Sequence, residues 1–290
     1  MNAATPRPFV GLLRLLRVGT LFSPAADVAA SAAIVGAAMD GALARAAAAS
    51  VCLYAAGMVW NDVADRNVDR TTRPERPLVR GDLSLATAIG IGAALLAIGI
   101  ALSPCRAHHA TIAVLVLAYD FGSKKAPVLG VLGMATLRAL NLATGLWLVG
   151  DVPAAQREHV LVAAWCYGVY IAAVTLLGIF EDAPHVRPRA VAAVQTAPPL
   201  AALFALVVVQ GGPWPAPCAA GVFALWFLRR NTRARAWPQA EIRRSMGHLL
   251  LGTMLFTACL AWAAGRPDIA TAIAAAIVPA RWIARRIALT

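Results

Sequence analysis

Acidic side chains recur at helical spacing in one stretch of the sequence. Asn61, Asp65 and Asp69 are spaced i, i+4 and i+8, and Asp62 lies three residues before Asp65. On an α-helix this spacing places the side-chain oxygens on one face. Hard cations prefer such oxygen ligands, and no His or Cys lies among them to favour zinc. The stretch therefore predicts a Mg²⁺ site.

Arginines follow these acidic residues at short intervals: Arg66, Arg70, Arg73, Arg76 and Arg80. A guanidinium group binds phosphate oxygens through paired N–H donors, so carboxylates followed by arginines predict a site for a metal and a diphosphate. The alternative is a solvated loop at the end of an apolar helix, which composition alone favours. The order and spacing of the residues favour the site.

The composition excludes an ordinary water-soluble domain. Of the 290 residues, 60% are hydrophobic and 14% are charged, whereas soluble domains contain about 25% charged residues. We therefore expect an integral membrane protein. The formal net charge of +12 raises the question of nucleic-acid binding. Because the basic residues lie between apolar spans and are not interleaved with aromatic residues, we predict no nucleic-acid partner.

Apolar stretches of roughly membrane-spanning length flank and position the acidic stretch. They cover residues 20–39, 44–60, 83–103, 108–121, 126–149, 160–180, 190–210, 214–228, 248–264 and 268–285. A membrane helix needs about 20 apolar residues, and the stretches 108–121 and 214–228 meet this requirement least well. We expect an all-α, polytopic membrane helix bundle of nine or ten transmembrane helices. No linker divides the chain, so residues 1–290 are predicted to form a single domain.

The distribution of basic residues predicts the topology. With ten spans both termini lie on one side of the membrane, and most of the 26 Lys and Arg residues fall on that side. By the positive-inside rule, loops rich in Lys and Arg stay in the cytoplasm. We therefore predict a multi-pass protein of the inner (plasma) membrane whose termini and acidic stretch are cytoplasmic.

The stretch from Asn61 to Gly81 resembles the first aspartate-rich motif of the UbiA family of intramembrane prenyltransferases. That motif reads Asn-Asp-x-x-Asp-x-x-x-Asp, followed by Pro-x-Arg-Pro and a Gly. Its positions are filled here by Asn61, Asp62, Asp65, Asp69, Pro74, Arg76, Pro77 and Gly81. The motif of the CDP-alcohol phosphotransferases does not fit, because Arg66 stands at its Gly position and Asp69 at its Ala position.

The resemblance implies a UbiA-like fold and Mg²⁺-dependent transfer of a prenyl group from a (poly)prenyl diphosphate to an acceptor within the membrane. It implies that Asn61, Asp65 and Glu181 hold the metals, with Asp62 and Asp69 as further ligands or as groups that orient them. The diphosphate would be bound by Arg17, Arg66, Lys124 and Lys125, with Tyr119 in the same Tyr- and Lys-bearing loop. For the two lysines, an ordinary topological role is the alternative.

The sequence departs from the second motif of the family, Asp-x-x-x-Asp at the end of the sixth helix. Leu177 stands four residues before Glu181, so Glu181 must serve as metal ligand alone or with Asp182. Alternatively, the two acidic residues merely end a helix. If Glu181 serves, it must face Asn61 and Asp65 across the cytoplasmic opening. The incomplete motif also motivates a second hypothesis, a protein of this fold that binds or transports an isoprenoid lipid with weak catalysis.

Two polar residues lie one turn apart in the fifth span, Arg138 and Asn141. An intramembrane arginine faces the bundle interior and requires a partner, for which Asp27 in the first span is a candidate. The pair either lines a substrate cavity or packs structurally. Together with the incomplete second motif it resembles the divergent branch of the family encoded in bacterial Ebo gene clusters. That branch implies no particular acceptor, so the partners expected are a prenyl diphosphate, an unknown small-molecule or lipid acceptor, and membrane lipid.

Overall fold

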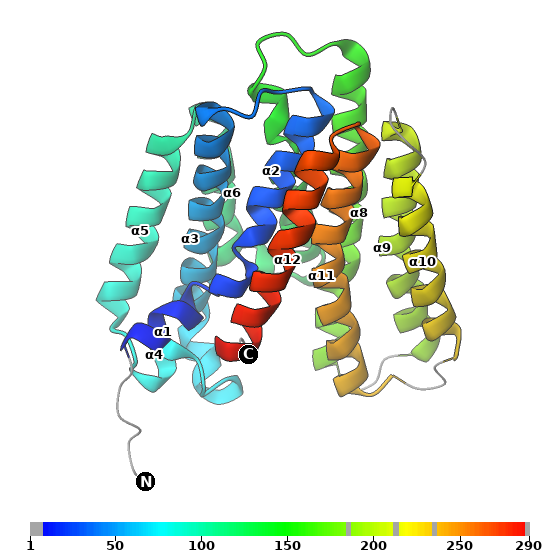
Figure 1. Cartoon of the computed structure of the whole chain (residues 1–290). Helices are drawn as coiled ribbons and strands as arrows, with labels where there is room; N and C mark the ends of the chain where they lie inside the picture. The colour runs from blue at the N-terminus through cyan, green and yellow to red at the C-terminus, as the bar shows by residue number, and fades with distance from the viewer. Residues whose placement is uncertain (1–7, 184–186, 211–214, 234–236, 288–290) are drawn as a thin grey trace.

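The computed structural model describes residues 8–183, 187–210, 215–233 and 237–287. These residues form α-helices and short 3-10 helices joined by brief connections, with no strand in the described ranges. The long helices stand side by side as one bundle (Figure 1). The prediction of an all-α bundle is confirmed.

The elements follow the chain in a simple order. They are α1 (Pro8–Leu15), η1 (Val18–Thr20), α2 (Phe22–Ile34), α3 (Gly41–Thr72), α4 (Pro77–Arg80), α5 (Leu85–Leu102), α6 (Arg106–Phe121), η2 (Ser123–Lys125), α7 (Pro127–Leu142), η3 (Ala143–Trp147), α8 (Ala154–Asp182), α9 (Pro188–Val209), α10 (Pro215–Arg233), α11 (Gln239–Ala263) and α12 (Pro267–Ile287). Each apolar stretch expected from the sequence corresponds to one of the long helices.

Eight segments of the described chain are long and apolar enough to cross a membrane. They are α1 with α2, α3, α5, α7 with η3, α8, α9, α11 and α12. The helices that fall short are α6, with only 16 residues, and α10, whose final turns carry several charged residues. These two match the stretches that met the length requirement least well in the sequence. They nevertheless pack in the bundle, α6 against α3 and α7, and α10 against α9 and α11.

Helix α3 carries the acidic stretch out of the apolar part of the bundle. It begins after Asp40, whose carboxylate accepts hydrogen bonds from the backbone N–H groups of Ala42 and Leu43, which caps the helix. Its 32 residues span about 48 Å, against a bilayer core of about 30 Å. The helix ends before Arg73 and Pro74, because a proline disfavours the helical conformation of the residue before it. Residues 61–69 therefore lie on the protruding end of one continuous helix, as predicted.

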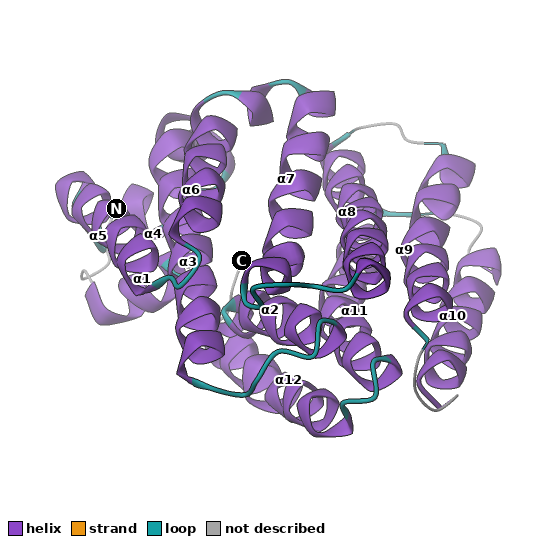
Figure 2. Cartoon of the chain, turned by 90° about the horizontal axis from the view of Figure 1, so that it is seen from above, coloured by secondary structure: helices purple, strands orange, loops and turns teal. Residues whose placement is uncertain are grey.

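The core forms around α2, which lies among α3, α7, α11 and α12 (Figure 2). This helix is rich in Ala, and its Val28, Ala30 and Ala32 side chains are completely buried. Small side chains allow neighbouring membrane helices to approach closely. Gly145 in η3 lies close to α2, and its backbone N–H donates a 2.9 Å hydrogen bond to the Ser31 hydroxyl.

The start of α1 and the end of α12 lie at the same end of the bundle as α4 (Figure 1). The Arg14 side chain donates a 3.2 Å hydrogen bond to the carbonyl oxygen of Ile287, which ties these two helices together. The ends of α3 and α8 lie there too, and we call this end of the molecule the motif end. Its predicted cytoplasmic location stays a prediction.

We predict that Gly145→Ala destabilises the fold. A Cβ at this position would lie 2.6 Å from the backbone carbonyl carbon of Ser31, so α2 and η3 would have to separate. Overpacking of this kind costs about 1–3 kcal/mol and lowers Tm in detergent. The matched control is Gly150→Ala, where a Cβ meets no atom within 4 Å. Equal Tm values for the two variants would contradict this packing argument.

Candidate functional site at the motif end

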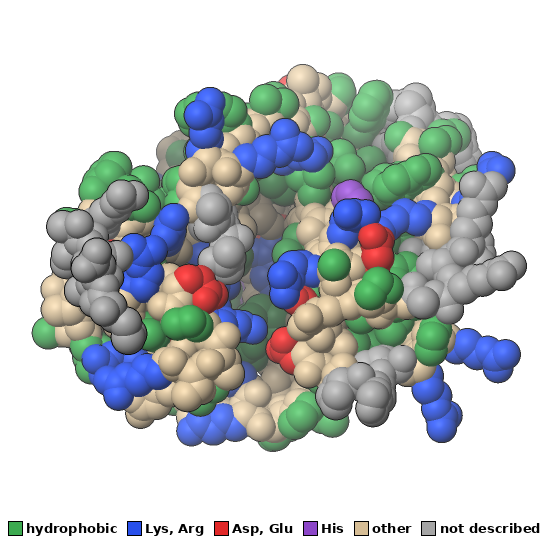
Figure 3. Space-filling model, turned by 90° about the horizontal axis from the view of Figure 1, so that it is seen from below, with side chains coloured by type: hydrophobic (Ala, Val, Ile, Leu, Met, Phe, Trp, Pro, Cys, Tyr) green, Lys and Arg blue, Asp and Glu red, His purple; other side chains and the backbone are tan. Residues whose placement is uncertain are grey.

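A cavity of about 240 Å³ lies between α3, α6 and α7. Its mouth at the motif end is polar and is lined by Arg17, Asn61, Tyr119 and Asp120. On this face the surface is hollowed, with Lys, Arg, Asp and Glu side chains around the hollow (Figure 3).

The interior of this cavity changes from apolar to polar with depth. Its middle is apolar and is lined by Gly57, Met58, Val116, Met134 and Leu137. The deep end is polar again, with Ser50, Arg138 and Asn141. Ser50 lies roughly 16 Å from the mouth, at a helical rise of about 1.5 Å per residue. The cavity therefore has two polar ends separated by an apolar segment.

The ammonium group of Lys124 lies at the mouth, surrounded by oxygen atoms. Its Nζ is 2.8 Å from Asp65 Oδ1, 3.1 Å from Asn61 Oδ1 and 3.8 Å from Asp120 Oδ1. The backbone carbonyl oxygen of Asn61 is 3.5 Å away. An all-oxygen set of this kind suits Mg²⁺. The residues of α3 and α6 therefore fit a hard cation, and the ammonium group stands in its place.

Asp62 lies on the same helix but binds arginines. It is 2% exposed, and its Oδ1 accepts a hydrogen bond from Arg76 and another from Arg17 at 3.4 Å. Burial lowers the pKa of the Arg76 guanidinium, and the Asp62 carboxylate opposes this shift. Asp62 thus holds the segments around Arg17 and Arg76 against α3. This geometry favours the orienting role over the role of metal ligand.

Arg17 occupies an unusual backbone conformation, with φ 48° and ψ 52°. A non-glycine residue in this left-handed region carries strain, which persists where the surroundings enforce it. Thr20 enforces it here, because its backbone N–H and its hydroxyl both donate 2.8 Å hydrogen bonds to the Arg17 carbonyl oxygen. Arg17 lines the cavity mouth, and its predicted contact with a diphosphate stays a prediction.

The acidic residues at the end of α8 are paired with arginines. Glu181 Oε1 accepts a 2.7 Å hydrogen bond from Arg243 Nε on α11. Asp182 Oδ2 lies 3.8 Å from Arg73 Nη2 at the end of α3. Leu177, in place of the first acid of the family motif, is completely buried in the core. Among the described residues, no three His, Cys, Asp or Glu side chains are grouped as metal ligands. The structure thus pairs Glu181 with Arg243 and Asp182 with Arg73, and the expectation that these two acids bind metal stays a prediction.

The remaining predicted residues are spread around this mouth. Asp69 is buried, with 4% of its surface exposed, within electrostatic range of Asp62 and Arg76. Arg66 is half-buried and Lys125 is exposed, and neither forms an ion pair with the described part of the chain. These two do not line the cavity. Their predicted contact with a diphosphate stays a prediction.

A buried polar cluster closes the deep end of the cavity. Arg138 Nη2 lies 3.0 Å from Asp27 Oδ2 and also donates hydrogen bonds to Ser23 and Tyr167. Asn141 donates a 2.9 Å hydrogen bond to the same Asp27 oxygen. The predicted pairing of Arg138 with Asp27 is confirmed. Both alternatives hold for Arg138 and Asn141, because they line the cavity and also pack against another polar group.

Comparison with known proteins identifies the family to which this arrangement belongs. The family model described as the UbiA prenyltransferase family matches residues 21–256. The chain belongs to this family.

Relatives of this UbiA protein include curated enzymes from other organisms. A digeranylgeranylglyceryl phosphate synthase from Methanoculleus marisnigri is 31% identical over 186 residues, which cover 61% of each chain. The enzyme of the same name from Ignicoccus hospitalis is 33% identical over 155 residues, which cover 50% of each chain. The matched part thus spans less than two thirds of these relatives.

Solved structures with a similar arrangement of helices include UbiA homologues. The apo structure of a homologue from Aeropyrum pernix K1 has a TM-score of 0.65 at 18% identity, covering 84% of this chain and 97% of that one. A homologue from Archaeoglobus fulgidus bound to GPP and Mg²⁺ has a TM-score of 0.58 at 18% identity, covering 86% and 98%. At such identities the likeness establishes the UbiA fold.

Sequence analysis of this UbiA protein missed Asp120 and Ser50. Asp120 lies at the cavity mouth, and its i, i+4 spacing from Lys124 is the one signal that points to it. Ser50 pairs with His109, the Oγ and Nε2 atoms being 3.0 Å apart. His109 Nδ1 in turn lies 2.6 Å from the Ser103 hydroxyl. No spacing rule links these residues, which belong to different helices and a connection.

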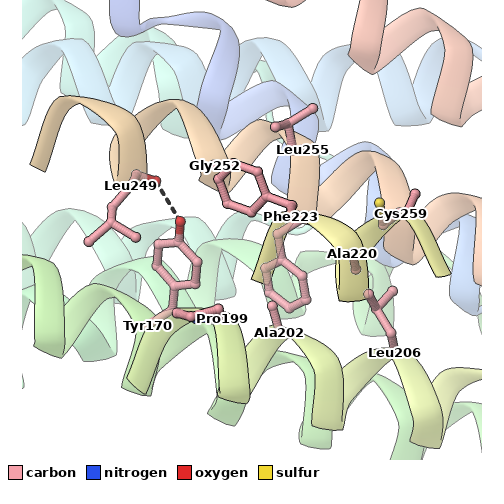
Figure 4. Close-up of a pocket in the computed structure, with 12 residues that line it drawn as sticks. Tyr170, Pro199, Ala202, Leu206, Ala220, Phe223, Leu249, Gly252, Leu255 and Cys259 are labelled. Carbon is pink, nitrogen blue, oxygen red and sulfur yellow. Dashed lines mark hydrogen bonds between the residues drawn. The ribbon is translucent and has the colours of Figure 1, made fainter. Parts of the chain in front are cut away.

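A second cavity of about 110 Å³ lies between α8, α9, α10 and α11 of the UbiA fold. Its walls are apolar and aromatic and include Tyr170, Leu206 and Phe223 (Figure 4). Phe256 lines it as well. The Tyr170 hydroxyl donates a 2.6 Å hydrogen bond to the carbonyl oxygen of Leu249. No charged residue from the described part of the chain lines this cavity. Of these two cavities, the first is the one whose described lining includes charged groups suited to binding a metal or a diphosphate.

We predict that Asp27→Ala strongly destabilises the bundle. The change leaves the Arg138 guanidinium buried without its ion-pair partner, which costs about 3–5 kcal/mol. A large drop in Tm in detergent would show this cost. The control is Asp268→Ala, which removes an exposed partner of Arg266 and is expected to leave Tm unchanged within error. Equal losses in the two variants would contradict the buried pair's importance.

Proposed function

We propose that this protein catalyses the Mg²⁺-dependent transfer of a prenyl group from a prenyl diphosphate to an acceptor within the membrane. The observation that carries the proposal is the set of oxygens from Asn61, Asp65 and Asp120 around one cation position, at the mouth of a cavity with an apolar middle. The names of the relatives and the GPP- and Mg²⁺-bound homologue support it.

The residues at the cavity mouth would have different roles in binding the diphosphate. Asn61 and Asp65 would hold Mg²⁺, which supplies Lewis-acid stabilisation of the negative charge that develops on the diphosphate. Arg17 and Lys124 would bind and neutralise diphosphate oxygens in the ionised state. Asp62 and Arg76 position Arg17 and α4 through their buried ion pair.

The apolar middle of the cavity suits the isoprenoid chain. Gly57 leaves room between α3 and α6, because a Cβ at this position would lie 3.3 Å from Val116. The apolar lining excludes water, and this protects an allylic cation from hydrolysis. At the deep end, Arg138 and Asn141 would contact a polar group of the substrates. The Asp27 carboxylate neutralises the Arg138 guanidinium. The polar group of the substrate at this end is therefore not required to be an anion.

The acceptor is proposed to be a membrane-soluble molecule that reaches the cavity from the bilayer. Because the relatives are named for a glyceryl phosphate product, a glyceryl phosphate lipid is the first acceptor class to test. The motif end would face the cytoplasm, since basic loops stay on that side of the membrane.

A second candidate function is binding or transport of an isoprenoid lipid with weak catalysis. The observation in its favour is that both acids at the end of α8 are paired with arginines, Glu181 with Arg243 and Asp182 with Arg73. Retention of a labelled prenyl diphosphate without product, reduced by EDTA, would support this function over transfer.

We predict that Asp65→Asn lowers prenyl diphosphate turnover by on the order of 10²-fold or more, because it removes a charged metal ligand. Release of diphosphate from labelled geranylgeranyl diphosphate, with Mg²⁺ and a panel of acceptors, measures this effect. The control is Asp151→Asn, an exposed residue in the α7–α8 connection. Turnover of Asp65→Asn at the unmodified protein's rate would contradict the proposed site, and no turnover by the unmodified protein would favour the binding function.

A further inference from the structure

We propose that the metal centre of this protein is built between α3 and α6, with Asp120 as a ligand in place of a carboxylate from α8. This inference rests on the proposed function and assigns a further ligand to its metal site. It also predicts that the protein without substrate binds one divalent cation, which is held by Asn61, Asp65 and Asp120.

Asp120 is a buried carboxylate with unused binding capacity. Its exposed fraction is 2%, and it lines the cavity mouth together with Asn61. Its Oδ2 is buried and has no hydrogen-bond partner, although such an atom costs free energy when it stays unpaired. Its Oδ1 faces the Lys124 ammonium at 3.8 Å. A carboxylate in this position is suited to bind a cation brought in from solution.

The ammonium group marks where that cation would lie. One point, Lys124 Nζ, is within 3.8 Å of side-chain oxygens from Asn61, Asp65 and Asp120. Oxygens bind Mg²⁺ at about 2.1 Å, so these three would be drawn inward around the ion. Lys124 would then be free to contact an anion beside the metal. The same short segment, the end of α6 with η2, supplies both the ligand and the lysine.

The α8 side of the mouth supplies guanidinium groups instead of free carboxylates. The Glu181 side chain is 13% exposed, and its Oε1 is bound by Arg243 Nε at 2.7 Å. Asp182 lies 3.8 Å from Arg73, and Leu177 is part of the core. The acids of α8 are therefore each paired with an arginine from another helix, and they are not grouped around one cation position as Asn61, Asp65 and Asp120 are. The Arg243 side chain is 70% exposed and can offer its remaining N–H groups to an anion.

The test measures the binding of Mn²⁺ to the full chain in detergent. Electron paramagnetic resonance detects the bound ion, and no prenyl diphosphate is present. The variants are Asp120→Asn and, as the matched control on α8, Glu181→Gln. We expect one Mn²⁺ per chain, a Kd raised about tenfold or more by Asp120→Asn, and a Kd within about twofold of the unmodified value for Glu181→Gln. Metal-free Tm values establish that both variants are folded.

A third variant, Lys124→Met, keeps the test decisive if Asp120→Asn does not fold. Removing the internal cation from the oxygens is expected to lower the Kd for Mn²⁺ several-fold, and a gain in affinity cannot arise from misfolding. The proposal is overturned if Lys124→Met fails to tighten binding, if Asp120→Asn binds normally, if Glu181→Gln weakens binding, or if two ions bind. Because no substrate is present, Asp120-dependent Mn²⁺ binding without turnover would count against the proposed function alone.

Discussion

The Lys124 ammonium group lies within a set of oxygen atoms at the mouth of a largely apolar cavity, and this electrostatic balance constrains the surrounding structure. Charged groups in an apolar bundle require partners, because the bilayer interior does not solvate them. The partners of Lys124 come from α3 and α6. These two helices must therefore keep a fixed register at the motif end, where α3 extends beyond the apolar part of the bundle.

The same requirement organises the other polar groups of the protein. Arg76 and Arg17 both form ion pairs with Asp62, and these pairs hold α4 and the strained turn at Arg17 against the end of α3. Deeper in the bundle, Arg138 and Asp27 join α7 to α2. Each pair also borders the cavity or its mouth, so the interactions that hold the helices together also shape the place where a substrate would bind. The fold and the candidate site depend on the same few charge pairs.

Much of this arrangement could be predicted from the sequence, because helical spacing is local information. The acidic face of α3, the ten helix positions and the need of Arg138 for a buried acidic partner all followed from spacing, length or burial cost. The pairing of Glu181 with Arg243 could not be predicted, because it depends on how the ends of α8 and α11 pack. For the same reason Asp120 did not stand out, since its role comes from the proximity of α6 to α3.

We propose that the cavity between α3, α6 and α7 holds the isoprenoid chain of a prenyl diphosphate whose head group lies at the motif end. Photocrosslinking with a diazirine-bearing prenyl diphosphate, with labelled peptides identified by mass spectrometry, would locate that chain. We expect Mg²⁺-dependent labelling of peptides that contain Met58, Met134 or Leu137. Labelling confined to the second cavity, around Phe223 and Phe256, or labelling that is indifferent to Mg²⁺, would contradict it.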